Sequence, residues 1–363
     1  MGVPLFASSL EPYHDLLAER IGAVVRSGRY ILGPEVEAFE AEFAAYLGVE
    51  HCVGVANGTD ALTIALRAVG IEPGDEVVVP SFTFYATAEA VVNAGAVPVF
   101  CDVDLDTGCI TADLVERALG DRTRAIVPVH LFGNVAPVEE LRALGLPVVE
   151  DAAQAAGAAR DGRRAGALGD AATFSFFPSK NLPCLGDGGA ITTDDGDVAA
   201  AARRLRFHGS TDKATFELVG YNSRLDAVQA AALRALLPEL DGWNDARRAA
   251  AGWYAERGLG DVPDIELPHA DAGARHVYHL YVARHPRADA VQAALGERGI
   301  GARGYYRVPV HSQPGMAGRG RVAGDLAATE ELARTNIALP IGPDLRAEQV
   351  DEVVAACRAA AGA

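Results

Sequence analysis

The sequence predicts an α/β fold in which a large domain with a mostly parallel sheet is followed by a smaller α+β domain. Three observations support this prediction. The chain has 363 residues, a length that favours about two domains. Apolar strand-like runs alternate with helical stretches over the first two thirds of the chain, as in helix-covered parallel sheets. This alternation stops near residue 241, so we place residues 1–241 in the large domain and residues 242–363 in the small one.

Two helices are expected at the beginning of the large domain. The first covers Tyr13 to Arg26. The second opens at Gly33-Pro34, because proline suits the first turn of a helix, and it ends at Gly48. Phe39 and Phe43 lie on one stripe of this second helix, so we expect its apolar face to pack against the rest of the domain.

Seven short apolar runs are expected to form the strands of the sheet, since they carry β-branched or aromatic residues and are separated by helical chain. These runs are Cys52 to Ala56, Glu76 to Val79, Val97 to Cys101, Ala125 to His130, Leu146 to Glu150, Thr173 to Phe177 and Ala190 to Thr193.

A helix from Arg224 to Leu240 is expected to lead out of the large domain, with the junction near Gly242-Trp243. In the small domain we expect a strand, a helix, a second strand and a terminal helix. Their ranges are His276 to Arg284, Ala288 to Arg298, Gly301 to Tyr306 and Arg346 to Ala361.

The composition excludes several classes of partner. A formal net charge of -17 disfavours nucleic acids and anionic membranes, which require basic surfaces. No apolar run reaches the ~18 residues of a membrane span, and the first thirty residues lack a signal-peptide pattern, so we expect a cytoplasmic protein.

No metal site is predicted. The five cysteines are odd in number and lack metal-ligand spacing, so we interpret them as reduced thiols. They are Cys52, Cys101, Cys109, Cys184 and Cys357. His276 and His279 are three positions apart on a predicted strand, where they would point to opposite faces.

Lys180 and Asp151 are the strongest candidates for chemistry. Each follows a predicted buried strand, and ligands of open α/β sheets gather beyond the carboxyl ends of the strands. Taken singly, the lysine would be a solvated surface residue and the aspartate an ion-paired or capping one. Together they supply what pyridoxal phosphate requires, a lysine for a Schiff base and a carboxylate for the pyridine nitrogen.

Two further segments fit such a cofactor. Asn57-Gly58-Thr59-Asp60 joins a predicted strand to a helical run, so free backbone N–H groups and the Thr59 hydroxyl meet there as an anion cradle. The alternative is an ordinary helix cap. Pro80 to Tyr85 follows the next strand and offers Phe84 as a stacking ring, although these aromatic residues could equally belong to the core.

The sequence resembles the sugar aminotransferases of the DegT/DnrJ/StrS family, a branch of the fold-type-I enzymes that use pyridoxal phosphate. The resemblance extends over nearly the whole chain. It is carried by Ser27 to Pro34, Ala56 to Leu62, Pro80 to Thr87, Glu150 to Gln154, Ser175 to Ala190 and Gly220 to Asp226.

The resemblance implies a role for each candidate residue. Lys180 would form the Schiff base, and Asp151 would contact the pyridine nitrogen. The other implied cofactor contacts are Gln154 at the ring hydroxyl, Phe84 stacked on the ring, Gly58, Thr59 and Ser175 at the phosphate, and Asn222 reaching that phosphate from a second subunit. The last contact implies a homodimer with shared active sites.

The implied reaction transfers an amino group from L-glutamate, or a similar donor, to a nucleotide-linked keto-sugar. The stretch from Phe176 to Gly189, with Asp187, looks more like relatives that aminate C3 than those that aminate C4. Pro183-Cys184 departs from the C3 pattern, Phe177 stands where many relatives have tyrosine, and Arg307 stands where proline is common. Phe177, Tyr306, Arg307 and His311 are the candidate substrate contacts.

Several alternatives are less favoured. A nicotinamide oxidoreductase would carry a G-x-G-x-x-G segment after an early strand, which is missing. Sugar dehydratases that resemble this chain have histidine in place of Lys180, and a non-catalytic binding protein would have lost Lys180 or Asp151. Sulfur transfer would need an activated cysteine, and nothing in the sequence marks Cys184 as one.

Overall fold

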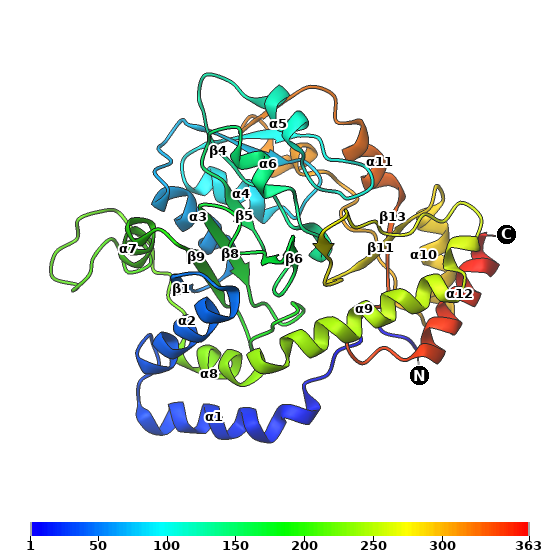
Figure 1. Ribbon diagram of the computed structural model, residues 1–363, viewed down its shortest axis with the longest axis horizontal. Helices are drawn as coiled ribbons and strands as arrows, with labels where there is room; N and C mark the ends of the chain where they lie inside the picture. Colours follow the sequence, from blue (N-terminus) through cyan, green and yellow to red (C-terminus); the bar gives the residue numbers. More distant parts are fainter. Residues whose placement is uncertain (1, 362–363) are drawn as a thin grey trace.

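The central feature of the fold is a mixed sheet of seven strands, seen in a computed structural model that describes residues 2–361 (Figure 1). Parallel bridges, Ile126 to Val148 and Val129 to Asp151, join its two halves. The strand order is β3-β2-β4-β5-β8-β9-β1, and only β9 runs antiparallel to its neighbours. The prediction of a mostly parallel seven-stranded sheet is therefore confirmed. The strands are β1 (His51–Val55), β2 (Glu76–Pro80), β3 (Val97–Cys101), β4 (Thr123–Ile126), β5 (Val149–Asp151), β8 (Ala171–Ser175) and β9 (Gly189–Thr193).

Helices cover both faces of this sheet. Successive strand residues point to opposite faces, and β2 shows the result: Val78 joins one buried cluster, whereas Val77 and Val79 join another. The helices of this part are α1 (His14–Ser27), α2 (Pro34–Leu47), α3 (Gly58–Ala68), α4 (Ala86–Asn93), α5 (Ala112–Ala118), α6 (Val138–Arg142), α7 (Gly196–Leu205) and α8 (Ala227–Leu236).

Helix α2 is bounded as the sequence predicts. Pro34 opens the helix, and Gly48 ends it with a positive φ of 81°, a conformation that glycine adopts without a steric penalty. Phe39 and Phe43 are fully buried and pack against Phe174 and Phe176, which flank the end of β8. The helix thus supports the strand that leads to Lys180.

The C-terminal third forms a separate buried cluster around a two-stranded antiparallel sheet. Its elements are α9 (Leu240–Glu256), β11 (Tyr281–Arg284), α10 (Ala288–Glu297), β13 (Asn336–Leu339) and α12 (Ala347–Ala361). Helix α11 (Ala327–Thr335) instead packs on a cluster of the large sheet, through Leu332 and Ala333. The N-terminal segment joins the C-terminal cluster, because Val3 bridges Ile300 and Phe6 bridges Ile341. Two-residue strands complete the pairing: β6 (Ala159–Arg160) with β7 (Arg163–Arg164) and β10 (Ala274–Arg275), and β12 (Arg321–Val322) with β3.

Three predicted elements were wrong in extent or type. The helix expected from Arg224 starts only at α8, because Asp226 is extended, and Pro238 then interrupts it. The strand expected from His276 is confined to β11. The strand expected from Gly301 to Tyr306 is replaced by a single bridge between Arg303 and Ala338, since the chain turns there to bring Tyr306 inward.

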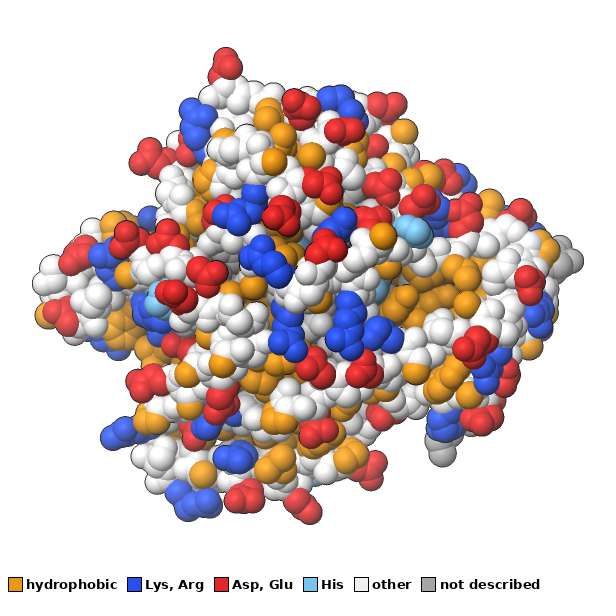
Figure 2. Space-filling model, in the orientation of Figure 1, with side chains coloured by type: hydrophobic (Ala, Val, Ile, Leu, Met, Phe, Trp, Pro, Cys, Tyr) orange, Lys and Arg blue, Asp and Glu red, His pale blue; other side chains and the backbone are white. Residues whose placement is uncertain are grey.

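The predicted domain boundary at residue 241 falls inside α9, which runs unbroken from the sheet-bearing part to the C-terminal cluster (Figure 1). The division into two domains stays a prediction. Figure 2 shows acidic and basic side chains interspersed over one face. Within residues 2–361, no helix is long and apolar enough to cross a membrane.

Candidate active site

Lys180 lies in a loop that β8 and β9 hold at both ends. The Phe176 N–H donates to the carbonyl of Gly188 (2.8 Å), and the Cys184 N–H donates to the carbonyl of Phe176 (2.7 Å). A tight turn from Phe177 to Lys180, closed by a 2.8 Å hydrogen bond, then presents the lysine. The loop is therefore a closed and fixed structure.

Asn181, the next residue, attaches this loop to the rest of the molecule. Its buried amide donates to the side chain of Asn244 on α9 (2.7 Å) and to the carbonyl of Val277 (3.0 Å). Asn244 in turn donates to the carbonyl of Ala156 (2.9 Å). The backbone next to Lys180 is thus fixed against two distant segments.

Asp151 is the last residue of β5, and its side chain is buried among hydrogen-bond donors. The Thr87 hydroxyl donates to Oδ2 (2.8 Å), and the Ala153 N–H donates to Oδ1 (3.2 Å). Only 6% of the residue is exposed. Both oxygens are held, so the carboxylate is fixed in orientation.

Burial affects the two candidate groups in opposite senses. It lowers the pKa of the Lys180 ammonium to about 8, although the nearby Asp151 charge works against this change. Burial also raises the pKa of Asp151, although the hydrogen bonds from Thr87 and Ala153 oppose it. The lysine is therefore available as a neutral nucleophile close to neutral pH, beside a carboxylate that a cation would stabilise.

The N-terminus of α3, where an anion cradle is predicted, lies beside Ser175. Asn57 is extended and its side chain caps the helix by accepting the Asp60 N–H (2.8 Å), so the predicted alternative, an ordinary cap, describes this residue. The first N–H groups of a helix have no partner within it, which leaves those of Gly58 and Thr59 to an anion. A Cβ on Gly58 would lie 2.7 Å from the Cβ of Ser175, so only glycine lets these two candidate residues meet.

Aromatic and amide side chains form a further wall of the site. Gln154 accepts the Phe132 N–H (2.7 Å) and donates to the Tyr306 hydroxyl (3.1 Å). The Tyr306 ring lies 5.9 Å from that of Phe84, and Phe84 is 55% exposed. The exposed Phe84 ring, beside the partly buried Tyr306, provides an apolar face for a ligand.

Comparison with known proteins accounts for this arrangement. The model of the DegT/DnrJ/EryC1/StrS aminotransferase family matches residues 14–358. This chain belongs to that family.

Relatives and solved structures agree with the assignment. The dTDP-3-amino-3,4,6-trideoxy-alpha-D-glucose transaminase of Streptomyces venezuelae is 48% identical over 95% of this chain and 93% of its own. The UDP-N-acetyl-3-dehydro-alpha-D-glucosamine 3-aminotransferase of Acidithiobacillus ferrooxidans is 46% identical over 96% and 94%. The crystal structure of S. venezuelae DesV in complex with a ketimine intermediate superposes with a TM-score of 0.96 at 46% identity, over 100% of this chain and 99% of DesV.

As a member of the DegT/DnrJ/EryC1/StrS family, the protein is an aminotransferase that uses pyridoxal phosphate. The described residues fit this cofactor. Gly58 and Ser175 are in such close contact that a Cβ on Gly58 would clash, so the N-terminus of α3 and the Ser175 hydroxyl lie close enough together to bind one phosphate. The buried Asp151 carboxylate suits a protonated pyridine nitrogen. The expected family, fold, enzyme class and cofactor are confirmed.

The four expected substrate contacts differ in what surrounds them. Tyr306 lies beside Gln154 and Phe84, and Phe177 is 52% exposed in the turn that presents Lys180. His311 Nδ1 is 2.6 Å from the Ser81 hydroxyl, next to the segment that carries Phe84. The guanidinium of Arg307 instead donates to the carbonyls of Ala333 and Arg334 at the end of α11 and pairs with Asp289 (2.8 Å). These contacts hold Arg307 against the chain, and its predicted contact with the substrate stays a prediction.

Asn222 does not join the other cofactor candidates through any described contact within this chain. It is exposed, and the Arg224 guanidinium donates to its side chain. A bridge between Phe207 and Asn222 closes the loop that projects between α7 and α8 (Figure 1). The predicted contact of Asn222 with the phosphate of a second subunit stays a prediction.

Cysteine chemistry has no support at this site. Cys184 is buried close to Lys180 in sequence, and burial raises the pKa of its thiol to about 11. A thiol of that kind is not activated as a nucleophile. In residues 2–361, no group of three or more His, Cys, Asp or Glu side chains is arranged to hold a metal ion.

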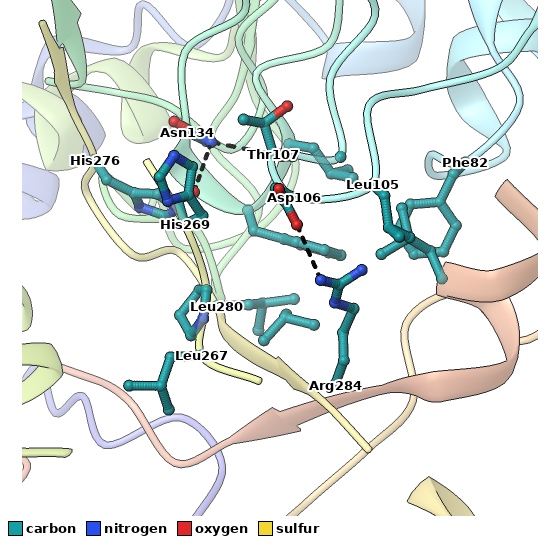
Figure 3. A pocket seen from close by; sticks show the side chains of 16 residues that line it. Phe82, Leu105, Asp106, Thr107, Asn134, Leu267, His269, His276, Leu280 and Arg284 are labelled. Carbon is teal, nitrogen blue, oxygen red and sulfur yellow. Dashed lines mark hydrogen bonds and ion pairs between the residues drawn. The ribbon is translucent and has the colours of Figure 1, made fainter. Parts of the chain in front are cut away.

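A small cavity of about 40 Å³ lies next to the site, lined in part by Phe82, Phe132 and Asn134 (Figure 3). Across it, Arg284 on β11 reaches Asp106 (3.0 Å). This volume exceeds the roughly 10–15 Å³ that one water molecule needs, so the cavity has room for water. None of the candidate cofactor residues lines it, so it is not the cofactor site.

Sequence reasoning missed Thr87 and Asn181 as supporting residues. Both lie inside segments that carry the family resemblance, but their partners are 64 and 63 positions away along the chain. A pattern within a short stretch of sequence cannot predict contacts between residues so far apart. The nearest signal is the position of Thr87, which falls in the first turn of a helix that follows a candidate aromatic segment.

Proposed function

We propose that this protein transfers an amino group from L-glutamate, or a similar donor, to C3 of a nucleotide-linked keto-sugar in amino-sugar biosynthesis. The observation that carries the proposal is the position of Lys180 in the loop after β8, near the buried Asp151 at the end of β5, whose charge acts on the pKa of the lysine. The position of amination is supported by the two relatives described above, whose names both place the reacting group at carbon 3.

The proposed mechanism assigns the proton transfers to Lys180. Pyridoxal phosphate, when bound, withdraws electrons from the carbon that loses or gains a proton. The Lys180 amine would hold the cofactor. With a pKa of about 8, the same amine, when free, would be able to take up and return the proton of the donor's α-carbon. Such general acid–base catalysis contributes about 10²- to 10⁴-fold.

The remaining candidate residues bind and orient the cofactor. Asp151, held by Thr87 and Ala153, would keep a proton on the pyridine nitrogen. Gly58, Thr59 and Ser175 would hold the phosphate, Phe84 would support one face of the ring, and Gln154 would contact the ring hydroxyl. Tyr306, Phe177 and His311 border the space left for the sugar.

We also infer a homodimer in which Asn222 completes the partner's phosphate site. The loop that ends at Asn222 exposes large apolar side chains: Phe216 is 58% exposed and Val219 is 84% exposed. Exposed apolar clusters of this kind mark protein–protein contacts. A cytoplasmic location is inferred as well, because all five cysteines are free, as is usual in reducing compartments.

Amination at C4 is the main alternative within the family. The chain retains Lys180, which argues against a sugar dehydratase, and it retains both Lys180 and Asp151, which argues against a non-catalytic binding protein. The position of the new nitrogen is therefore the question that an experiment has to decide.

The test has two steps. The purified protein is first mixed with pyridoxal phosphate, and its absorbance spectrum is recorded before and after L-glutamate is added. Conversion of the bound cofactor to its aminated form establishes the donor half of the reaction. The aminated enzyme is then mixed with 3-keto and 4-keto nucleotide sugars carrying dTDP, UDP or GDP, and NMR of the product locates the nitrogen.

Lys180→Ala and Lys180→Arg serve as matched controls. Both should lose the covalently bound cofactor and turnover, while Lys180→Arg should still fold, because it keeps the length and charge of the side chain. Normal turnover in either variant would contradict the assignment. A product with nitrogen at C4 would leave the enzyme class intact and overturn the C3 proposal.

A further inference from the structure

A buried ion pair holds the strand that leads into the phosphate cradle. β1 is the edge strand of the sheet and lies next to α2 (Figure 1). Gly54 on β1 donates its N–H to Glu40 Oε1 on α2 (2.8 Å), and its carbonyl accepts from the guanidinium of Arg206 (2.7 Å). Arg206 and Glu40 also pair directly, with side chains only 10% and 12% exposed.

The same arginine connects this strand to the segment that carries Asn222. The backbone carbonyl of Arg206 accepts the Ser223 N–H (3.0 Å). The Ser223 hydroxyl in turn accepts the Ala56 N–H (3.1 Å). The backbone between Gly54 and Ala56, immediately before the Asn57 cap and Gly58, is therefore held at three points.

This arrangement provides hydrogen-bond partners for the N–H and carbonyl groups of Gly54 at the edge of the sheet. An edge strand presents unpaired N–H and C=O groups, and here both outward groups of Gly54 are satisfied by one ion pair. A side chain on Gly54 would crowd Leu225, whose Cβ lies 3.1 Å from the position of a Cβ there. The end of β1 and the segment from Arg206 to Leu225 are thus in close contact.

We propose that Arg206 and Glu40 are positioning residues for the cofactor phosphate: they hold the backbone of β1 so that the Gly58 and Thr59 N–H groups point at the phosphate. This proposal rests on the cofactor site proposed above. Because Glu40 neutralises Arg206, the pair acts through the position of the backbone and not through direct attraction of the phosphate charge.

The test compares the affinity of the apoprotein for pyridoxal phosphate with its affinity for pyridoxal, which lacks the phosphate. In Arg206→Met, the dissociation constant of pyridoxal phosphate should rise about tenfold, as expected when a hydrogen-bonded contact is lost. The dissociation constant of pyridoxal should change less than about twofold, because its contacts with Lys180 and Asp151 are untouched. Both constants are measured by absorbance titration at constant pH and ionic strength.

Arg234→Met is the matched control. Arg234 forms comparable ion pairs with Glu35 and Glu42 of the same helix α2, but none of its described contacts reaches residues 54–58. Its loss should leave the ratio of the two affinities unchanged. Ser223→Ala, which removes only the hydroxyl that accepts the Ala56 N–H, provides a milder variant if Arg206→Met does not fold, and it should shift the ratio in the same direction.

The outcomes separate this inference from the proposed function. A selective loss of affinity for pyridoxal phosphate supports the positioning role. An equal loss for both ligands would show a purely structural role, and no loss would remove the role altogether. If the wild-type protein binds neither ligand, the proposed cofactor site itself fails.

Discussion

At the scale of single residues, the pKa of Lys180 makes a direct prediction about pH. Only the neutral amine captures pyridoxal phosphate, so the capture rate of the apoprotein should rise with pH and level off above about 8, the pKa set by burial. The Asp151 charge raises that pKa, so Asp151→Asn should move the midpoint to a lower pH. Stopped-flow absorbance measures both profiles. A midpoint near 10.5, the ordinary lysine value, would show that the amine is solvated.

Thr87 provides a second prediction at this scale. Thr87→Val keeps the shape of the side chain but removes the hydroxyl that donates to Asp151, which should raise the pKa of this carboxyl further. We expect kcat to fall about tenfold, the cost of one hydrogen bond to a charged group, together with a shift in the pH dependence of the bound cofactor's absorbance. Thr192→Val, which removes a buried hydroxyl bonded to the Gly166 carbonyl, is the control and should leave this spectrum unchanged.

The candidate residues that could be predicted from the sequence are those whose signal is local. Asp151 ends a strand, Lys180 follows one, and Gly58 opens a helix after a strand, so a short window of chain suffices for each. Thr87, Asn181 and Arg206 gain their importance from partners 64, 63 and 166 positions away. Such contacts depend on how the strands are ordered in the sheet, which no short window contains.

At the scale of elements, β5 places a candidate cofactor residue, Asp151, on one face of the sheet and a structural carboxylate, Glu150, on the other. Asp151 ends the strand, while its neighbour Glu150 points to the opposite face. Glu150 is fully buried and accepts from His130 Nε2 (2.7 Å) and from the backbone N–H groups of Gly166, Leu168 and Gly169. Burial penalises its charge, but the His130 bond and the backbone donors overcome this and lower its pKa. The carboxylate thus fixes the turn that leads into β8.

Glu150→Gln should therefore destabilise the fold by about 3 kcal/mol, because an amide cannot accept all of these hydrogen bonds. The lowered pKa fixes the sign of the pH effect. The stabilising contribution of Glu150 is complete above the unfolded pKa of 4.5 and is lost as pH falls through the folded value. The gap between wild type and variant in urea unfolding should consequently be large at pH 7 and shrink in acid. The exposed Glu139→Gln variant should show no such gap.

The type of most elements could be predicted because their patterns are long or well bounded, as for α2 between Pro34 and Gly48. The elements that were predicted wrongly have weaker sequence patterns. The segment from Gly301 to Tyr306 alternates like a strand, but packing of Tyr306 against Gln154 and Phe84 draws it into the site. The antiparallel direction of β9 also could not be predicted, since an apolar run has no direction.

At the scale of the whole molecule, the proposed sharing of active sites predicts that two defective chains can restore each other. Lys180→Ala and Asn222→Ala dimers should each have low activity. A mixed dimer would contain one site with both native residues, so an equal mixture after subunit exchange should reach about a quarter of wild-type activity. If Lys180 and Asn222 served the same chain's site, mixing would restore nothing.

The oligomeric state is measured in parallel by analytical ultracentrifugation. Restored activity requires that subunits exchange, so the mixture is co-expressed with two different affinity tags and the doubly tagged species is isolated. This species should have about half the activity of the wild-type dimer, because one of its two sites is intact. A monomer at working concentration would remove the basis of the proposal.

Helix α9 restricts motion between the sheet-bearing part and the C-terminal cluster. Its 17 residues form a rod about 25 Å long, continuous across the junction between the sheet-bearing part and the C-terminal cluster, and its Asn244 is bonded to the neighbour of Lys180. The two parts therefore cannot swing about a flexible linker at this crossing, and any bending there has to deform a helix. Gly242 and Gly252 are its softest positions, since a Cβ on either would meet nothing within 4 Å and glycine weakens a helix by up to about 1 kcal/mol. The stiffness of the helix at these two residues thus limits how far bending motions of the C-terminal cluster can displace Lys180.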